Sequence, residues 1–200
     1  MALLSWFFSR STHAGPIRRT GFWLATLAMS SLLASRSWAE TEFKEYQLKA
    51  VFLFNFAQFV EWPGTAFASQ QSPLIIGVIG EDPFRELLDD VVRDEHSGHR
   101  EILVRRLRKV EEVEGCQILF ISKSESANLE PILAALGNRP LLTVSDVDGA
   151  ALRGAMVRLV TEKRRIRFRI NLEATKRAGL VISSKLLRAA EIVTTRKELP

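Results

Sequence analysis

The most constraining feature of this sequence is a set of short apolar runs, each bounded by residues that favour turns. The runs are residues 73–80 (PLIIGVIG), 101–107 (EILVRRL), 116–122 (CQILFIS) and 140–146 (PLLTVSD). Such runs are typical of strands that are buried on both faces of a parallel sheet. Helical segments separate them, as at residues 129–136, which lie between Asn128 as a cap and Gly137 as a terminator. This alternation predicts an α/β fold, with a mainly parallel sheet flanked by helices.

The segment after the first run predicts a further helix. Asp82 would cap it, with Pro83 at its first position. Its inner face would consist of Phe84, Leu87, Leu88 and Val91. We therefore expect this helix to connect the first two parallel strands.

The last third of the sequence changes to an antiparallel pattern. Residues 154–161 and 165–171 flank a short polar turn, and the second segment alternates apolar with basic side chains. These basic side chains are Arg165, Arg167 and Arg169. We expect an antiparallel hairpin at the edge of the sheet, followed by one last helix over residues 172–193 that Asn171 caps.

The aromatic segment FNFAQFVEWP, residues 54–63, predicts a helix that Pro63 ends at Trp62. Its polar side chains fall within one narrow arc at the helical period, and its apolar arc is wider than one core contact requires. The apolar arc is either buried between the sheet and neighbouring helices, or partly exposed as an interface. The second interpretation assigns Trp62, with Phe59 or Phe56 beside it, to a protein–protein surface.

Residues 1–39 have the three parts of an export signal. Arginines precede the apolar stretch GFWLATLAMSSLLA at residues 21–34, and small residues stand at Ser37 and Ala39. The stretch is shorter than a comfortable membrane span, which favours a cleaved signal over an uncleaved anchor. We therefore expect cleavage after Ala39 and a periplasmic location for residues 40–200.

Removal of this segment changes the charge of the chain. The full sequence carries 28 basic and 23 acidic residues, a formal net charge of +5. Because the segment holds four arginines and no acid, residues 40–200 keep 28 − 4 = 24 basic and 23 acidic residues, or +1. A near-neutral chain does not favour binding to nucleic acid. No repeat or linker divides residues 40–200, so we expect a single domain.

No motif predicts catalysis, a cofactor or a metal site, so we expect a protein that is not an enzyme. The first apolar run lacks the third glycine of a dinucleotide fingerprint, and Glu81 and Asp82 would repel a phosphate there. His96 and His99 lie in a polar loop. Cys116, the only cysteine, opens an apolar strand and has no partner for a disulfide within the chain.

Two sets of polar residues remain as candidate binding sites. The first follows the carboxyl ends of the predicted parallel strands, where open α/β sheets bind ligands, and consists of Asp82, Ser122, Lys123, Ser145 and Asp146. The second is the basic row of Arg165, Arg167 and Arg169, whose charge favours an acidic partner. The alternative roles are helix caps and turns for the first set, and protection of an edge strand for the second.

The order of these motifs resembles the YfiR-like family of periplasmic proteins. The resemblance covers residues 46–192 and rests on the export signal together with YQLKAVFLFNFAQFVEWP, IGVIGEDPF, GCQILFIS, PLLTVSD and FRINLEATKRAGLVISSKLLRAA. It implies a regulatory protein, without enzymatic activity or cofactor, that restrains an inner-membrane diguanylate cyclase by contacting its periplasmic domain. It further implies effects on cyclic-di-GMP signalling and biofilm formation, an outer-membrane lipoprotein as a second partner, and a homodimer.

The resemblance leaves two questions open. Some members form disulfides through the cysteine that matches Cys116, whereas this chain has no second cysteine for such a bridge. The second function class that fits the sequence is a periplasmic sensor that binds a small ligand at the carboxyl ends of the strands. A deep crevice would favour this sensor, and an exposed aromatic patch would favour the regulator.

Overall fold

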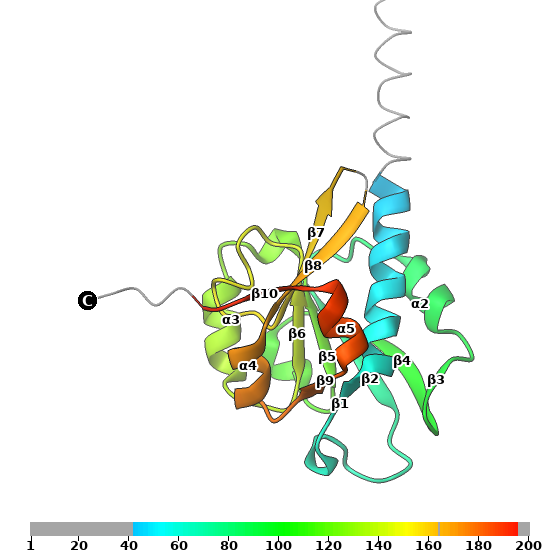
Figure 1. The fold of residues 1–200 in the computed structure, drawn as a ribbon. Helices are drawn as coiled ribbons and strands as arrows, with labels where there is room; N and C mark the ends of the chain where they lie inside the picture. The colour runs from blue at the N-terminus through cyan, green and yellow to red at the C-terminus, as the bar shows by residue number, and fades with distance from the viewer. Residues whose placement is uncertain (1–41, 164, 196–200) are drawn as a thin grey trace, which may run out of the picture. The chain divides into compact units, whose positions relative to one another are not determined.

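The computed structural model describes residues 42–163 and 165–195, so the expected export signal lies outside the described residues. Their centre is an eight-stranded sheet with the order β10-β8-β7-β6-β5-β2-β4-β3 (Figure 1). In chain order the strands of this sheet are β2 (Leu74–Ile79), β3 (His96–Ser97), β4 (Arg100–Leu107), β5 (Ile118–Ile121), β6 (Leu142–Ser145), β7 (Val157–Glu162), β8 (Arg165–Asn171) and β10 (Glu191–Val193).

The central strands of the sheet are parallel and doubly wound. Strands β4, β2, β5, β6 and β7 run in one direction, and their order corresponds to 2-1-3-4-5 along the chain, as in flavodoxin-like folds. Strand β8 is antiparallel to β7, and β10 is parallel to β8. The predicted mainly parallel sheet with an antiparallel hairpin is confirmed. The outermost strand on this side is β10 rather than β8, because the chain returns to the sheet after its last helix.

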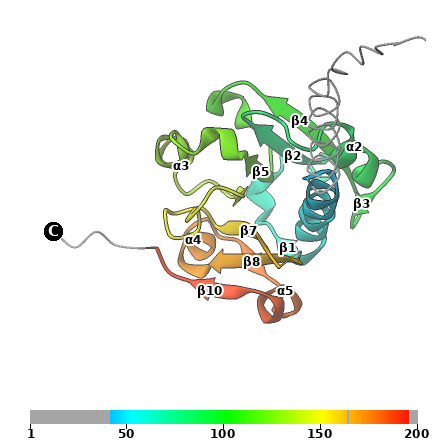
Figure 2. The same ribbon diagram turned by 90° about the horizontal axis from the view of Figure 1, so that it is seen from above.

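Helices cover both faces of the sheet and enclose two cores (Figure 2). The first core includes side chains of the helix over residues 42–59, α2 (Glu86–Val92), α4 (Leu172–Arg177) and α5 (Ser184–Ala189). The second includes side chains of α3 (Leu129–Leu136) and the short helix η2 (Val110–Val113). The strands supply both cores because successive side chains point to opposite faces. In β2, for example, Ile76 and Val78 join the first core, and Ile75 and Ile79 join the second.

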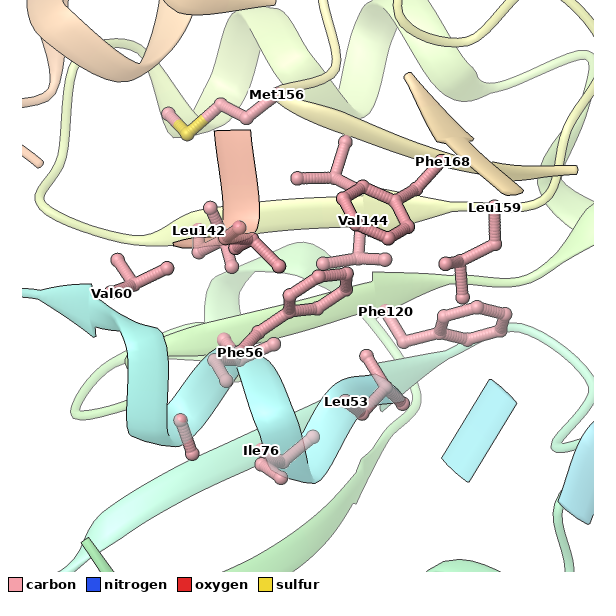
Figure 3. Packing of buried hydrophobic residues seen from close by; sticks show 14 of the residues in the cluster. Leu53, Phe56, Val60, Ile76, Phe120, Leu142, Val144, Met156, Leu159 and Phe168 are labelled. Atoms are coloured by element: carbon pink, nitrogen blue, oxygen red, sulfur yellow. The ribbon is translucent and has the colours of Figure 1, made fainter. Parts of the chain in front are cut away.

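The helix over residues 42–59 is the predicted aromatic helix. Leu53 and Phe56 point from it toward the buried side chains of the sheet (Figure 3). The helix ends before Trp62, because the next residues form β1 (Val60–Glu61), which pairs antiparallel with β9 (Val181–Ile182). The predicted position of its end was wrong, because the backbone of residues 60–61 forms hydrogen bonds with β9, which begins 121 residues after β1, instead of continuing the helix.

Two other predicted helices differ in their extent. Helix α2 begins at Glu86 rather than at Pro83, because Asp82 accepts a hydrogen bond of 2.8 Å from the N–H of Phe84 and closes a local turn. The expected last helix is split into α4 and α5. Gly179 has a φ of 69°, a left-handed conformation that follows the end of α4 and leads into β9. The predicted cap at Asn171 is confirmed, since its side chain accepts from the N–H of Ala174.

Candidate functional site

The carboxyl ends of β2 and β5 meet where the strand order reverses, a position at which open α/β sheets commonly bind ligands. In this protein the chain itself occupies that position. The N–H of Glu81 donates a hydrogen bond of 2.9 Å to Oγ of Ser124, in the short helix η3 (Lys123–Glu125). A Cβ atom on Gly80 would lie 2.5 Å from that oxygen and 2.8 Å from Cγ of Glu125. Helix η3 therefore packs directly on the end of β2, and glycine permits this close approach.

The other residues predicted for a crevice at this edge do not converge on one point. The carboxylate of Asp82 pairs with Arg106 at 2.9 Å. The hydroxyl of Ser145 donates to a backbone carbonyl of β5 at 2.7 Å and accepts from the N–H of Val147 at 3.1 Å. Ser122 is buried, and Lys123 is exposed. These contacts correspond to turns and strand ends, the alternative role that the sequence left open.

Asp146 differs from this set because it lies in a buried cluster at the end of β6. Its Oδ2 accepts hydrogen bonds from Nζ of Lys49 at 2.8 Å and from the hydroxyl of Tyr46 at 2.9 Å. Lys49 also pairs with Glu45, one helical turn earlier, at 2.7 Å. The side chains of Lys49 and Asp146 are only 4% and 3% exposed. This cluster joins the helix over residues 42–59 to the carboxyl edge of the sheet.

The electrostatics of the cluster favour a structural role. Burial raises the pKa of Tyr46 well above its usual value, and the negative charge of Asp146 raises it further. For Glu45, burial raises the pKa, but hydrogen bonds from Lys49 and Thr161 outweigh burial, so that its pKa is lowered. Both shifts move the pKa of these side chains further from neutral pH. The arrangement therefore suits the fixing of a helix better than the transfer of protons.

Sequence reasoning missed Tyr46 and Lys49 as members of this site. A usable signal was present, because both residues lie on the same side of the helix as Ala50 and Leu53, which are buried. A lysine on a buried helix face requires a charged partner, since an unpaired buried ammonium is costly.

Among the described residues, Oδ1 of Asp146 and Nε of Arg158 are buried without a hydrogen-bond partner.

The aromatic residues predicted for a partner surface lie at different depths. Phe56 has no exposed surface and packs on Phe168, with ring centroids 5.9 Å apart, so the structure corrects its assignment to an interface. It is buried because the helix turns this position toward the sheet (Figure 3). Phe59 and Trp62 are partly buried against the same core. The indole N–H of Trp62 donates to the carbonyl of Gln117 at 3.0 Å, which ties this side chain to the start of β5.

The exposed apolar side chains of the same helix are Phe43, Leu48 and Val51, and we call them the helix surface. They are 55%, 49% and 39% exposed. Leu48 does not belong to the first core. This face of the helix is mixed, because the exposed polar side chains of Lys44, Gln47 and Gln58 lie around Val51 at the helical period.

The predicted basic row lies on β8, and its three members have different surroundings. Arg169 pairs with Glu191 of β10 at 2.8 Å and with Glu162 of β7 at 3.4 Å. Arg167 is exposed and lies 3.9 Å from Glu162, while Arg165 is exposed at the start of the strand. Strand β10 pairs only with residues 169–171 of β8, so Arg165 and Arg167 lie on the part of this strand that β10 does not cover, where their charges can still protect a sheet edge. Two of its charges face solvent, and the third holds β10.

Other polar groups show no arrangement for chemistry. Within the part of the chain that the structure describes, no group of three or more His, Cys, Asp or Glu side chains is placed to hold a metal ion. His96 and His99 contact backbone carbonyl groups in the same exposed region. Cys116 is buried, and burial raises the pKa of its thiol, which lowers its reactivity.

Comparisons with known proteins identify the family of this chain. A comparison with curated proteins found no match, and no helix in residues 42–163 and 165–195 has the length and apolar character to cross a membrane. A family model described as YfiR/HmsC-like matches residues 46–191, which is most of the chain and includes Tyr46, Lys49 and Asp146. The chain therefore belongs to the YfiR/HmsC-like family, and this membership suggests a periplasmic regulator in cyclic-di-GMP signalling.

Proposed function

We propose that this protein is a non-enzymatic periplasmic regulator that binds an inner-membrane signalling enzyme of the diguanylate cyclase type and restrains it. The mature protein would begin at Glu40, after removal of the export signal. Membership of the YfiR/HmsC-like family supports this function. The single observation that carries it is the helix surface, Phe43, Leu48 and Val51, which the sheet leaves uncovered. Leu48 and Val51 are three residues apart, so their side chains are neighbours on the helix, and neighbouring exposed apolar side chains are typical of contacts between proteins.

The contact that we propose joins the helix surface to an apolar face of the periplasmic domain of the enzyme. Apolar burial would supply most of the affinity. The exposed charges of Arg165 and Arg167 would guide an acidic partner and increase the rate of association. The resemblance also implies a homodimer and sequestration by an outer-membrane lipoprotein. We propose that both interactions use the helix surface and compete with the enzyme for it.

Site-specific photo-crosslinking in the periplasm tests this proposal. A photo-reactive amino acid replaces Leu48 or Val51, and matched controls place it at Leu103 or Leu152, which are 40% and 42% exposed elsewhere on the molecule. We expect the first two positions to crosslink to a membrane enzyme with a periplasmic domain, which mass spectrometry identifies, and the controls not to do so. Crosslinks only to a second copy of the chain, or equal crosslinks from all four positions, would contradict the proposal.

A functional measurement completes the test. We expect Leu48→Asp to abolish the crosslink from Val51 and to raise the cellular cyclic-di-GMP concentration, because the enzyme is no longer restrained. Leu103→Asp is the control and should leave both unchanged. If Leu48→Asp removes the crosslink without any change in cyclic-di-GMP, the surface binds a partner that is not the cyclase.

A further inference from the structure

A cavity of about 320 Å³ lies at the amino ends of β6 and β7, between α3 and α4. It is on the opposite edge of the sheet from Asp146. Small-molecule sites typically measure roughly 300–1,000 Å³, so this cavity has the size for a small ligand only. None of the residues predicted from the sequence as a ligand crevice lines it.

The floor of the cavity is apolar. It is formed by Leu133 and Leu136 of α3, by Leu141 and Met156 just before β6 and β7, and by Ala174 of α4. Thr143 lies among these side chains, but its Oγ1 already accepts a hydrogen bond of 2.9 Å from the N–H of Met156. The floor therefore presents apolar surface to a ligand, which favours a ligand with an apolar body.

The rim of the cavity is cationic. Its charged residues are Glu130, Arg139, Arg153 and Arg177, which gives three positive charges, one negative charge and a net of 3 − 1 = +2. Arg153 binds Glu130 through two hydrogen bonds of 2.5 and 2.6 Å, so these two charges neutralise each other. Among the residues that the structure describes, the guanidinium groups of Arg139 and Arg177 have no hydrogen-bond or ion-pair partner. The uncompensated charge of the cavity thus resides on these two arginines.

We propose that this cavity is a binding site for a small carboxylate with an apolar body. The planar guanidinium groups of Arg139 and Arg177 can bind a carboxylate through paired hydrogen bonds, while the floor covers the rest of the ligand. Inorganic phosphate would satisfy the arginines but would leave the apolar floor uncovered. The site goes beyond the proposed regulatory function and does not rest on it, because none of its residues belongs to the helix surface.

Amide NMR titrations of the exported protein with three probes test this proposal. The probes are hydrocinnamate, its neutral amide hydrocinnamamide, and inorganic phosphate. We expect hydrocinnamate to shift the signals of Gly137, Asn138, Gly154 and Arg177 in a saturable manner, with a millimolar dissociation constant that is reasonable for so small a ligand. The amide and phosphate should bind at least about tenfold more weakly, because each lacks one of the two required features.

Two variants locate the binding. The double variant Arg139→Gln and Arg177→Gln should weaken hydrocinnamate binding about tenfold or more. The control is the double variant Arg108→Gln and Arg188→Gln, which removes the same charge from exposed positions elsewhere. This control should bind hydrocinnamate as the wild type does. Ala134→Phe, at an exposed position of α3 that lines the cavity, should block binding without unfolding the protein. Equal binding of acid and amide, equal losses in both double variants, or shifts spread over the whole surface would overturn the proposal, as would the absence of any shift.

Discussion

The ammonium group of Lys49 lies 2.8 Å from the carboxylate of Asp146, although the two residues are 97 positions apart in the sequence. This ion pair is almost fully buried, and it fixes the helix over residues 42–59 at the end of β6. The same helix presents the helix surface on its opposite side. A displacement of this helix would therefore change both the first core and the proposed partner contact.

The first prediction concerns the strength of this pair. Asp146→Asn and Lys49→Met should each lower the free energy of unfolding by about 3 kcal/mol, because each leaves a buried charge without its main partner. The double variant should lose less than the sum of the two, since neither charge remains, and the difference should lie within about 0.5–3 kcal/mol. Urea unfolding followed by circular dichroism measures all three values. Strictly additive losses would show that the two side chains do not stabilise each other.

The second prediction uses the fact that Tyr46 is the only tyrosine of the chain. Because burial and the charge of Asp146 raise its pKa above the ordinary value of 10.0, folding favours the neutral phenol. The resulting contribution to stability is complete below pH 10 and is lost as the pH rises through the pKa of the folded state. The ultraviolet absorbance of phenolate should therefore have its midpoint above pH 10 in the folded protein and at about 10 in guanidinium.

Asp146→Asn is the matched variant for this titration, because it removes the charge while preserving a hydrogen-bond acceptor for Tyr46. The midpoint of the folded variant should move toward that of the unfolded chain. A wild-type midpoint identical in folded and unfolded protein would show that the Tyr46 hydroxyl is in contact with solvent rather than with Asp146.

The third prediction distinguishes a core role of Trp62 from a role as a binding anchor. Its side chain is partly buried, and it binds Gln117, whose side chain in turn accepts from the N–H of Ile75 at 2.8 Å and donates to the carbonyl of Ala66 at 2.7 Å. We expect Trp62→Ala to cost about 3 kcal/mol of folding stability. Trp62→Phe, which loses the hydrogen bond but keeps an aromatic ring, should cost about 1 kcal/mol. A melting temperature unchanged by Trp62→Ala, together with weakened partner binding, would instead identify an anchor.

Local patterns were sufficient to predict the parallel strands and the β7–β8 hairpin, but not β3 or β10, because the side chains of a long strand and of a helix repeat with fixed periods. The apolar run of β2 and the alternation of β8 are examples. Asn128 and Gly137 marked the ends of α3, although the side chain of Asn128 makes no capping hydrogen bond and donates to Glu125 instead. The β1–β9 pairing was not predictable in this way, since neither two-residue strand has a period of its own. It ended the first helix early, whereas the last helix is divided at Gly179, which is a local signal for a helix end. A contact between distant segments thus decided the end of the first helix.

The candidate site was likewise predicted only in part. Asp146 was identified because it follows a predicted strand, and its position in the sequence is enough for that prediction. Its partners Tyr46 and Lys49 come from a helix whose orientation on the sheet no local pattern specifies. The cavity between α3 and α4 was missed for a related reason. Arg139 lies in the loop after α3 and Arg177 ends α4, and only the packing of these segments brings them to one rim.

The last prediction concerns the basic row of β8 and association with a partner. The sequence suggested that Arg165, Arg167 and Arg169 act together, but Arg169 is paired with Glu191 and holds the edge strand β10. Its pKa is raised, first by this hydrogen bond, whereas the other two guanidinium groups face solvent. Arg165→Gln combined with Arg167→Gln should therefore slow association with an acidic partner and reduce the dependence of the association rate on salt, with little effect on the dissociation rate. Arg169→Gln alone is the control, which should alter association less and destabilise β10 instead. Stopped-flow mixing with the crosslinked partner, once identified, measures both rates, and amide exchange of Ile192 and Val193 reports on β10. If the double variant associates at the wild-type rate at low salt, the two exposed arginines do not steer the partner.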